Sequence, residues 1–210
     1  MSQQQGLSAT LSLNTATIVG NNYYGSGLDD KINVGNKSSK IYAGEGNNLV
    51  NAGNGNNLIY AGAGRDIITT GNGKNTVYAG EGINLVTAGS GNDLIYAGSA
   101  GDFINAGDGK NTIFAGEGNN SILSGKGNDS IFAATDENRI IACASTDYVV
   151  AIARIDGVIP SATENSVIPS TRKDRIIAFT RQNAVVAFTC KDRILTIACI
   201  DEVTCCTRVD

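Results

Sequence analysis

Polar and hydrophobic residues recur along this chain with a period of nine from Gly44 onward. Eighteen successive nonapeptides carry Asn or Asp at their fifth position, from Asn48 to Asp201. Their seventh position is always Ile or Val, from Val50 to Val203. A unit of nine residues is too short to bury its apolar side chains alone, so successive units must stack. The pattern predicts an all-β solenoid with position 7 inside and a turn at position 5.

A longer period sets the size of each coil. Aromatic residues occupy position 8 of alternate nonapeptides, 18 residues apart, at Tyr42, Tyr60, Tyr78, Tyr96, Phe114 and Phe132. Two nonapeptides should therefore form one coil of a parallel β-solenoid, or β-roll, with about ten coils from Ser26 onward. In the second half of the chain, each nonapeptide is expected to hold a strand of about seven residues and a two-residue corner.

The outer surfaces of the predicted sheets are unusually apolar. The aromatic column predicts either a stack that stabilises its own sheet or a surface that binds a partner, and the sequence leaves both open. Further along, period-two alternation places a second apolar stripe outside, which another subunit or the N-terminal segment is expected to cover. The expected assembly surface comprises Tyr60, Tyr78, Tyr96, Phe114, Phe132, Ile177, Phe179, Val186 and Phe188.

Glycine content divides the chain into three parts. Residues 26–133 form a Gly- and Asn-rich β-roll, and residues 134–210 continue the same solenoid with little glycine. Residues 1–25 precede the repeats and are a candidate cap or donated strand. The repeat is expected to reach the C-terminus without a polar cap, which would leave a strand edge open for pairing.

Composition excludes several classes of function. The formal charge of −4, with both signs interspersed, indicates neither nucleic-acid nor anionic-membrane binding, and no apolar run approaches the length of a membrane span. The chain has no His, and no Ser or Cys lies in a motif with an identifiable base, so we expect no enzyme. The five Cys all lie in the last third and are expected to be free thiols.

The segments AGEGNNLVN, AGSGNDLIY and SGKGNDSIF resemble the RTX family of nonapeptide repeats. The resemblance is specific in its glycine spacing, covers residues 44–133 well and covers residues 26–43 loosely. It implies a right-handed parallel β-roll with 18 residues per turn, in which the Asp of each Gly-rich turn binds calcium. It also implies leaderless export to the cell surface or beyond, and the N-terminus has no signal-peptide pattern. Free Cys suit a reducing interior instead, so the compartment stays open.

The sequence departs from this family at the metal-binding position. Within the Gly-rich coils no two Asp lie one coil apart. The calcium candidates Asp66, Asp93, Asp102 and Asp129 would each offer a single carboxylate and bind weakly. The remaining fifth positions predict a ladder of amides that needs no metal, at Asn48, Asn57, Asn75, Asn84, Asn111 and Asn120. No cofactor is expected to be required, and folding should need little or no calcium.

Three functions compete on this basis. The leading hypothesis is a non-enzymatic structural protein, a self-assembling subunit of a filament, surface layer or adhesin that contacts its own copies head to tail and laterally. The alternative is a secreted RTX-like calcium-binding module. The third is an ice-binding protein, which is ranked low because outer pairs such as Leu58 and Tyr60 do not form a uniform Thr grid.

Overall fold

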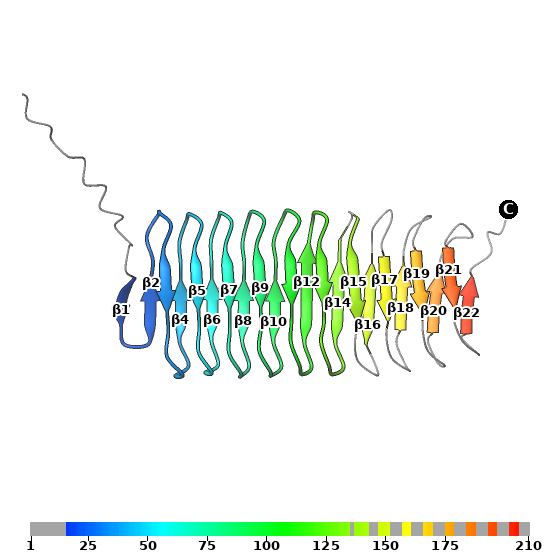
Figure 1. The fold of residues 1–210 in the computed structure, drawn as a ribbon, viewed down its shortest axis with the longest axis horizontal. Helices are drawn as coiled ribbons and strands as arrows, with labels where there is room; N and C mark the ends of the chain where they lie inside the picture. The colour runs from blue at the N-terminus through cyan, green and yellow to red at the C-terminus, as the bar shows by residue number, and fades with distance from the viewer. Residues whose placement is uncertain are drawn as a thin grey trace, which may run out of the picture.

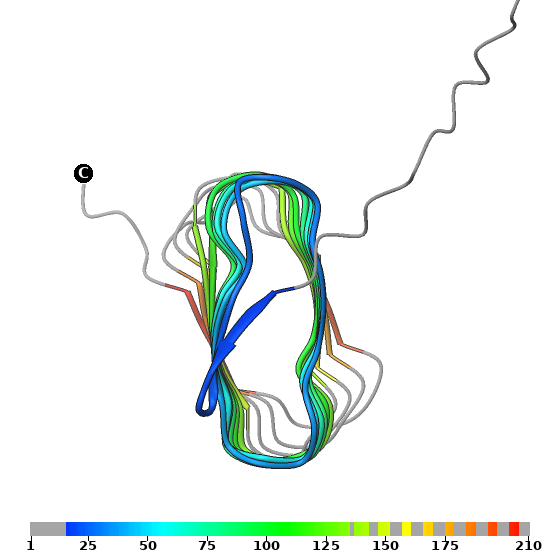
Figure 2. The same ribbon diagram turned by 90° about the vertical axis from the view of Figure 1, so that its left-hand side faces the viewer.

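The structure is a computed structural model that describes residues 16–134, 137–142 and 147–151 and six strands between residues 157 and 205, with side chains as far as Val150. Within these residues the chain forms strands and turns and no helix. The strands stack side by side along one long axis (Figure 1). Seen along that axis, the well-aligned coils form a flattened ring with a sheet on each long side (Figure 2). The predicted parallel β-solenoid is confirmed.

From β2 onward the strands alternate between two sheets that face each other (Figure 2). The twelve-stranded sheet contains β1 (Thr17–Val19), β2 (Asn22–Tyr24), β4 (Lys40–Tyr42), β6 (Leu58–Tyr60), β8 (Thr76–Tyr78), β10 (Leu94–Tyr96), β12 (Thr112–Gly116), β14 (Ser130–Ala133), β16 (Tyr148–Ala151), β18 (Ser166–Pro169), β20 (Ala184–Ala187) and β22 (Glu202–Cys205). The ten-stranded sheet contains β3 (Lys31–Asn33), β5 (Leu49–Asn51), β7 (Ile67–Thr69), β9 (Leu85–Thr87), β11 (Phe103–Asn105), β13 (Ser121–Leu123), β15 (Arg139–Ala142), β17 (Gly157–Pro160), β19 (Arg175–Ala178) and β21 (Arg193–Thr196).

Strand pairing fixes the coil at 18 residues. In β6 and β8, for example, Ile59 pairs with Val77 and Tyr60 with Tyr78, and both pairings are parallel. The predicted coil of two nonapeptides is therefore confirmed. The fourteen strands from β3 to β16 make seven coils at two strands each, whereas about ten coils were predicted for the whole array. The strands β17 to β22 continue the same alternation.

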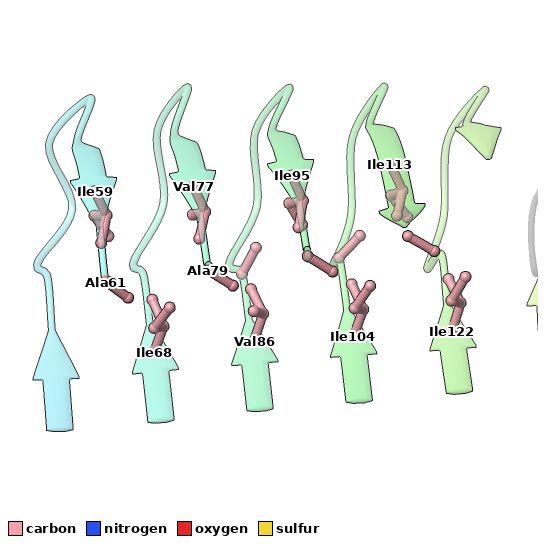
Figure 3. Packing of buried hydrophobic residues seen from close by; sticks show 14 of the residues in the cluster. Ile59, Ala61, Ile68, Val77, Ala79, Val86, Ile95, Ile104, Ile113 and Ile122 are labelled. Carbon is pink, nitrogen blue, oxygen red and sulfur yellow. The ribbon is translucent and has the colours of Figure 1, made fainter. Parts of the chain in front are cut away.

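The core is a thin double layer of small and branched side chains. Ile or Val at position 7 is buried in every coil whose side chains are described, and Ala at position 9 is buried beside it in most of them. Figure 3 shows Ile59 and Ala61 from one sheet beside Ile68 from the other. Burying each Ile or Val contributes about 1.5 to 3 kcal/mol, so the strict choice at position 7 has a direct energetic cause.

The strands are shorter than the sequence predicted. They contain three to five residues, and those of the Gly-poor half contain four, so the expected seven-residue strand is wrong. The corners take up the remaining residues of each nonapeptide. In the Gly-rich half they do so because many corner glycines adopt a positive φ and turn the chain sharply, which leaves positions 6 to 8 for regular pairing.

Glycine at position 1 is required by the close approach of stacked corners. Gly80 has a φ of +83°, and a Cβ built on it would lie 1.7 Å from the backbone oxygen of Gly62 in the preceding coil. Among the described residues, Ala100 is the one non-glycine at positive φ, at 117°. It stands at position 3, where the sequence GSAGD has its glycine one place later than the other repeats.

The N-terminal end of the solenoid carries a hairpin. Strand β1 pairs antiparallel with β2, which itself pairs in parallel with β4. Figure 2 shows β1 crossing the end of the first coil. Tyr23 in β2 and Ala16 before β1 pack against the core. The hairpin is thus placed where a cap would lie, and capping itself stays a prediction.

Ala100→Gly should stabilise the solenoid. Ala at positive φ is strained by its Cβ, and glycine relieves that strain at the expense of a more flexible unfolded chain, so a net gain of about 1 kcal/mol is expected. Thermal or urea denaturation would measure it. Gly82→Ala, which places a Cβ at the equivalent position 3 of another coil, should have the opposite effect; a stabilised Gly82→Ala would contradict this account.

Candidate functional site

In the nonapeptides that the structure describes, as far as Asp147, the fifth residue points into the corner of the coil. These side chains stack in two columns, one at each narrow end of the coil, and all are buried. The first column contains Asp30, Asn48, Asp66, Asn84, Asp102, Asn120 and Asn138. The second column contains Ser39, Asn57, Asn75, Asp93, Asn111, Asp129 and Asp147. The structure therefore brings together all ten residues predicted as calcium candidates or as members of the amide ladder.

A hydrogen bond joins each position 5 to the next coil. The backbone N–H of Asn48 donates to Oδ1 of Asp66 at 2.7 Å, and that of Asp66 donates to Oδ1 of Asn84 at 2.9 Å. The second column repeats the contact, for example from the Asn75 N–H to Asp93 Oδ1 at 2.7 Å. Asn and Asp supply this oxygen equally well, because the amide and the carboxylate both offer Oδ1 as an acceptor.

The second atom of the side chain separates Asn from Asp. The Asn57 Nδ2 donates to the backbone oxygens of Gly53 at 2.9 Å and Gly55 at 2.8 Å, within its own corner. The same two contacts, to the residues four and two places earlier, recur at Asn48, Asn75, Asn84 and Asn111. An Asn corner is therefore closed, since its amide satisfies the carbonyls of the glycine turn.

An Asp corner lacks that donor. The Oδ2 atoms of Asp66, Asp93, Asp102 and Asp129 are buried and have no hydrogen-bond partner. Burial raises the pKa of all four carboxyls, that of Asp66 and Asp129 to about 6 and that of Asp102 to about 7. Each Asp corner is thus a buried acceptor that faces carbonyl acceptors, which favours a proton or a cation between them.

Two carboxylates do lie one coil apart at the end of the Gly-rich half. The Asp129 N–H donates to Oδ1 of Asp147 at 2.9 Å, and the charge of Asp147 further raises the pKa of Asp129. The hydroxyl of Ser124 lies 3.5 Å from both Asp147 Oδ2 and the Gly125 oxygen. The sequence did not predict this pair, because neighbouring carboxylates were expected only within the Gly-rich repeats and Asp147 lies beyond them. The 18-residue spacing alone would have revealed it.

Comparison with known families agrees with this architecture. The profile of the RTX calcium-binding nonapeptide repeat matches overlapping segments that run from residue 24 to residue 140, more than half of the chain. The chain belongs to the RTX nonapeptide-repeat family. Comparison with curated proteins and with solved structures gave no match. The family assignment therefore confirms the resemblance. It also makes the corners the place where a calcium ion is expected.

The corners differ in how well their ligands suit a calcium ion. Calcium takes six to eight oxygen ligands and prefers several carboxylates. An Asn corner in this RTX chain presents a nitrogen donor where a cation would need oxygen. A lone Asp corner presents one carboxylate, and only Asp129 and Asp147 are neighbouring carboxylates among the described fifth positions. In the same part of the chain, no group of three His, Cys, Asp or Glu side chains is placed to hold a metal ion.

The aromatic column forms a continuous stack on the twelve-stranded sheet. It begins at Tyr24, one coil before the predicted start, and ring centroids along it lie 4.7 to 5.3 Å apart at interplanar angles of 1° to 11°. The predicted members Tyr60, Tyr78, Tyr96, Phe114 and Phe132 all belong to it. The side chains of Ile177 and Val186, and the residues Phe179 and Phe188, lie outside the described part of the chain.

A second apolar surface, not predicted, lies on the ten-stranded sheet. Position 6 of successive coils holds Leu49, Ile67, Leu85 and Phe103, which are paired in register and are 39%, 40%, 42% and 55% exposed. We call these four residues, three aliphatic and one aromatic, the aliphatic stripe. Lys31 and Arg139 occupy position 6 of the same sheet in coils that lie before and after the stripe along the axis. The signal was present in the sequence as apolar residues at position 6 of alternate repeats.

The raised pKa values predict that stability falls as the pH rises in the absence of divalent cations. A carboxyl with a folded pKa of about 6 and an unfolded pKa of about 3.9 holds its proton more tightly when folded. Its contribution is complete below about pH 4 and is lost as the pH rises through about 6. Melting temperatures measured with chelator between about pH 4 and about pH 8 would test this sign.

Asp66→Asn should raise the melting temperature at neutral pH and weaken its dependence on pH. The new amide would donate to the Gly62 and Gly64 oxygens, as Asn48 and Asn84 do in their own corners, with a gain of about 1 to 2 kcal/mol. Asp108→Asn is the matched control, because Asp108 is exposed and accepts a similar backbone bond from Lys126. Equal effects of the two substitutions on the melting temperature would show that the corner contacts of Asp66 are not the cause of the change.

Proposed function

We propose that this RTX chain is a non-enzymatic structural module that assembles with further copies of itself in a filament, surface layer or adhesin. The aliphatic stripe supports this proposal best. Monomeric soluble proteins rarely expose a contiguous row of large apolar side chains on a flat sheet. A partner is expected to cover it, and burial of each side chain would contribute about 1.5 to 3 kcal/mol.

A second copy of the chain is the partner whose repeat spacing matches that of this surface. The stripe presents one side chain per coil, at the ~4.8 Å spacing of neighbouring strands, and another solenoid of the same chain repeats at the same spacing. Two such faces can interdigitate along their whole length, as paired sheets do in steric zippers. Head-to-tail contact at the sheet edges would extend the assembly along the axis, because strand edges offer unpaired backbone groups.

The same features argue for a role without catalysis. The RTX β-solenoid is a non-catalytic repeat fold, and the chain has no His to act as a base. The buried carboxyls lie in corners where backbone N–H groups bind them, behind Gly-rich turns. They are held as structural acceptors and not presented in a cleft, which favours a structural role over acid–base chemistry.

A secreted calcium-binding module is the second candidate, and the Asp129–Asp147 pair favours it. Two neighbouring carboxylates, a hydroxyl and turn carbonyls are hard oxygen ligands of the kind that calcium takes. RTX repeats are typical of exported proteins, so we propose the cell surface or the exterior as the location. Within the described residues, no helix has the length and apolarity to cross a membrane.

Replacing Leu85 and Phe103 by Lys should dissociate the assemblies. Lys31 and Arg139 occupy the same position 6 in other coils of this sheet, so the fold accepts cations there and the variant should stay folded. Its two added positive charges should repel the same face of a second copy. Analytical ultracentrifugation would compare it with Ser90→Lys/Asn128→Lys, which adds the same charge at exposed corner positions. If the unmodified protein sediments as a monomer at high concentration, self-assembly is wrong and the calcium-binding module takes its place.

Asp147→Asn should abolish the tightest calcium binding of the chain. The substitution keeps the Oδ1 that accepts the Asp129 N–H but removes one of the two neighbouring charges. Isothermal titration with calcium chloride would measure the loss, with Asp108→Asn as the control for net charge. Undiminished binding in the Asp147 variant would mean that the ion binds elsewhere.

A further inference from the structure

We propose that the Asn amides of the corner columns stand in the place of the family's calcium ions, so that one Asn→Asp change within a column is sufficient to restore a calcium site. This inference does not depend on self-assembly. It concerns Asn84, which lies between Asp66 and Asp102, and Asn111, which lies between Asp93 and Asp129.

The first support is the position of the amide nitrogen. The Asn84 Nδ2 lies 3.3 Å from the Gly80 oxygen and 2.9 Å from the Gly82 oxygen. A cation bound in this corner would need the same two oxygens as ligands. The nitrogen and the ion therefore compete for one space, and the partial positive charge of the amide hydrogens serves the carbonyls as a cation would.

The second support is the link that the amide makes along the column. The Asn75 Nδ2 donates to Oδ1 of Asp93 at 3.0 Å while it also donates to the Gly71 and Gly73 oxygens at 3.2 and 3.0 Å. One NH2 group thus bridges the turn of its own coil and the carboxylate of the next. Bridging ligands of two successive coils is the role that a stacked ion would have.

The third support is the contrast with the Asp corners. Where Asp replaces Asn, the turn geometry is kept but the second side-chain oxygen has no partner, as at Asp66 and Asp102. Each of these corners holds one carboxylate and a set of carbonyls, and its neighbours in the column are closed by amides. The missing element is a second charge one coil away, which Asn84→Asp would supply on both sides.

The test uses the full chain with Asp147→Asn in every variant, which removes the pair at the end of the Gly-rich half. Asn84→Asp is added to that background and compared with Asn57→Asp. Like Asn84, Asn57 donates from Nδ2 to the two glycine oxygens of its own turn, and it also donates to Asn75 Oδ1 at 3.3 Å. Its column neighbours are Ser39 and Asn75, so Asp at 57 has no neighbouring carboxylate. The melting temperature and calorimetric calcium binding are measured at neutral pH, in chelator and with calcium chloride.

Both variants should melt lower than the background in chelator, because each loses the amide and gains a buried charge. Calcium should restore only Asn84→Asp, with an affinity about tenfold or more above that of Asn57→Asp. If Asn84→Asp is unfolded in chelator, calcium should recover its β-sheet circular dichroism, and Asn111→Asp should behave alike. An equal calcium response of Asn84→Asp and Asn57→Asp, or no response of either, would overturn the proposal.

Discussion

Each coil is tied to the next by the hydrogen bond from the position 5 backbone N–H to Oδ1 of the residue 18 places later. The strands contain as few as three residues, so much of the backbone lies in corners where sheet pairing alone cannot satisfy it. Position 4 adds a ladder of the opposite direction, in which the Arg65 N–H donates to Asn47 Oδ1 in the preceding coil. The position 5 ladder requires a short side chain with an oxygen on Cγ, whereas the position 4 ladder also uses the hydroxyl of Ser38 as an acceptor. That requirement explains why position 5 is Asn or Asp even where the glycines vanish.

Sequence periodicity predicted the features that one residue type imposes in every coil. The Tyr60 to Tyr78 spacing gave the coil size, and Ile and Val at position 7 gave the interior, because hydrophobic burial depends on the residue alone. Strand length was missed, since it depends on where the corner hydrogen bonds take over from pairing. The aliphatic stripe was not predicted, because position 6 varies along the chain between apolar residues such as Leu85, hydroxyl residues such as Thr76 and cations such as Lys31. The acceptors of the Asn amide hydrogens could not be predicted from the sequence, because they depend on the backbone conformation of the glycine turn.

Replacing an ion by an amide changes how folding depends on the surroundings. A protein whose corners hold calcium gains stability with calcium concentration, because the ion binds the folded state and not the unfolded one. An amide is covalently attached, so its contribution is present at any calcium level. The cost is that it carries no full charge and cannot neutralise a carboxylate next to it. The charge of an Asp corner flanked by Asn is therefore not neutralised, which agrees with the raised pKa values of Asp66 and Asp102.

The two outer faces are not equivalent in what they can bind. In the aromatic stack each ring covers the face of the next, as between Tyr60 and Tyr78 with centroids 4.7 Å apart and planes within 1°. Face-on stacking with a sugar or a flat ligand would require those ring faces, which the neighbouring rings already occupy. The stack ends at Phe132, where Tyr148 meets it edge-on at 63°. The column thus stabilises its own sheet and offers ring edges outward. The aliphatic stripe, whose side chains keep their contact surface free, is left as the face with the greater gain from association.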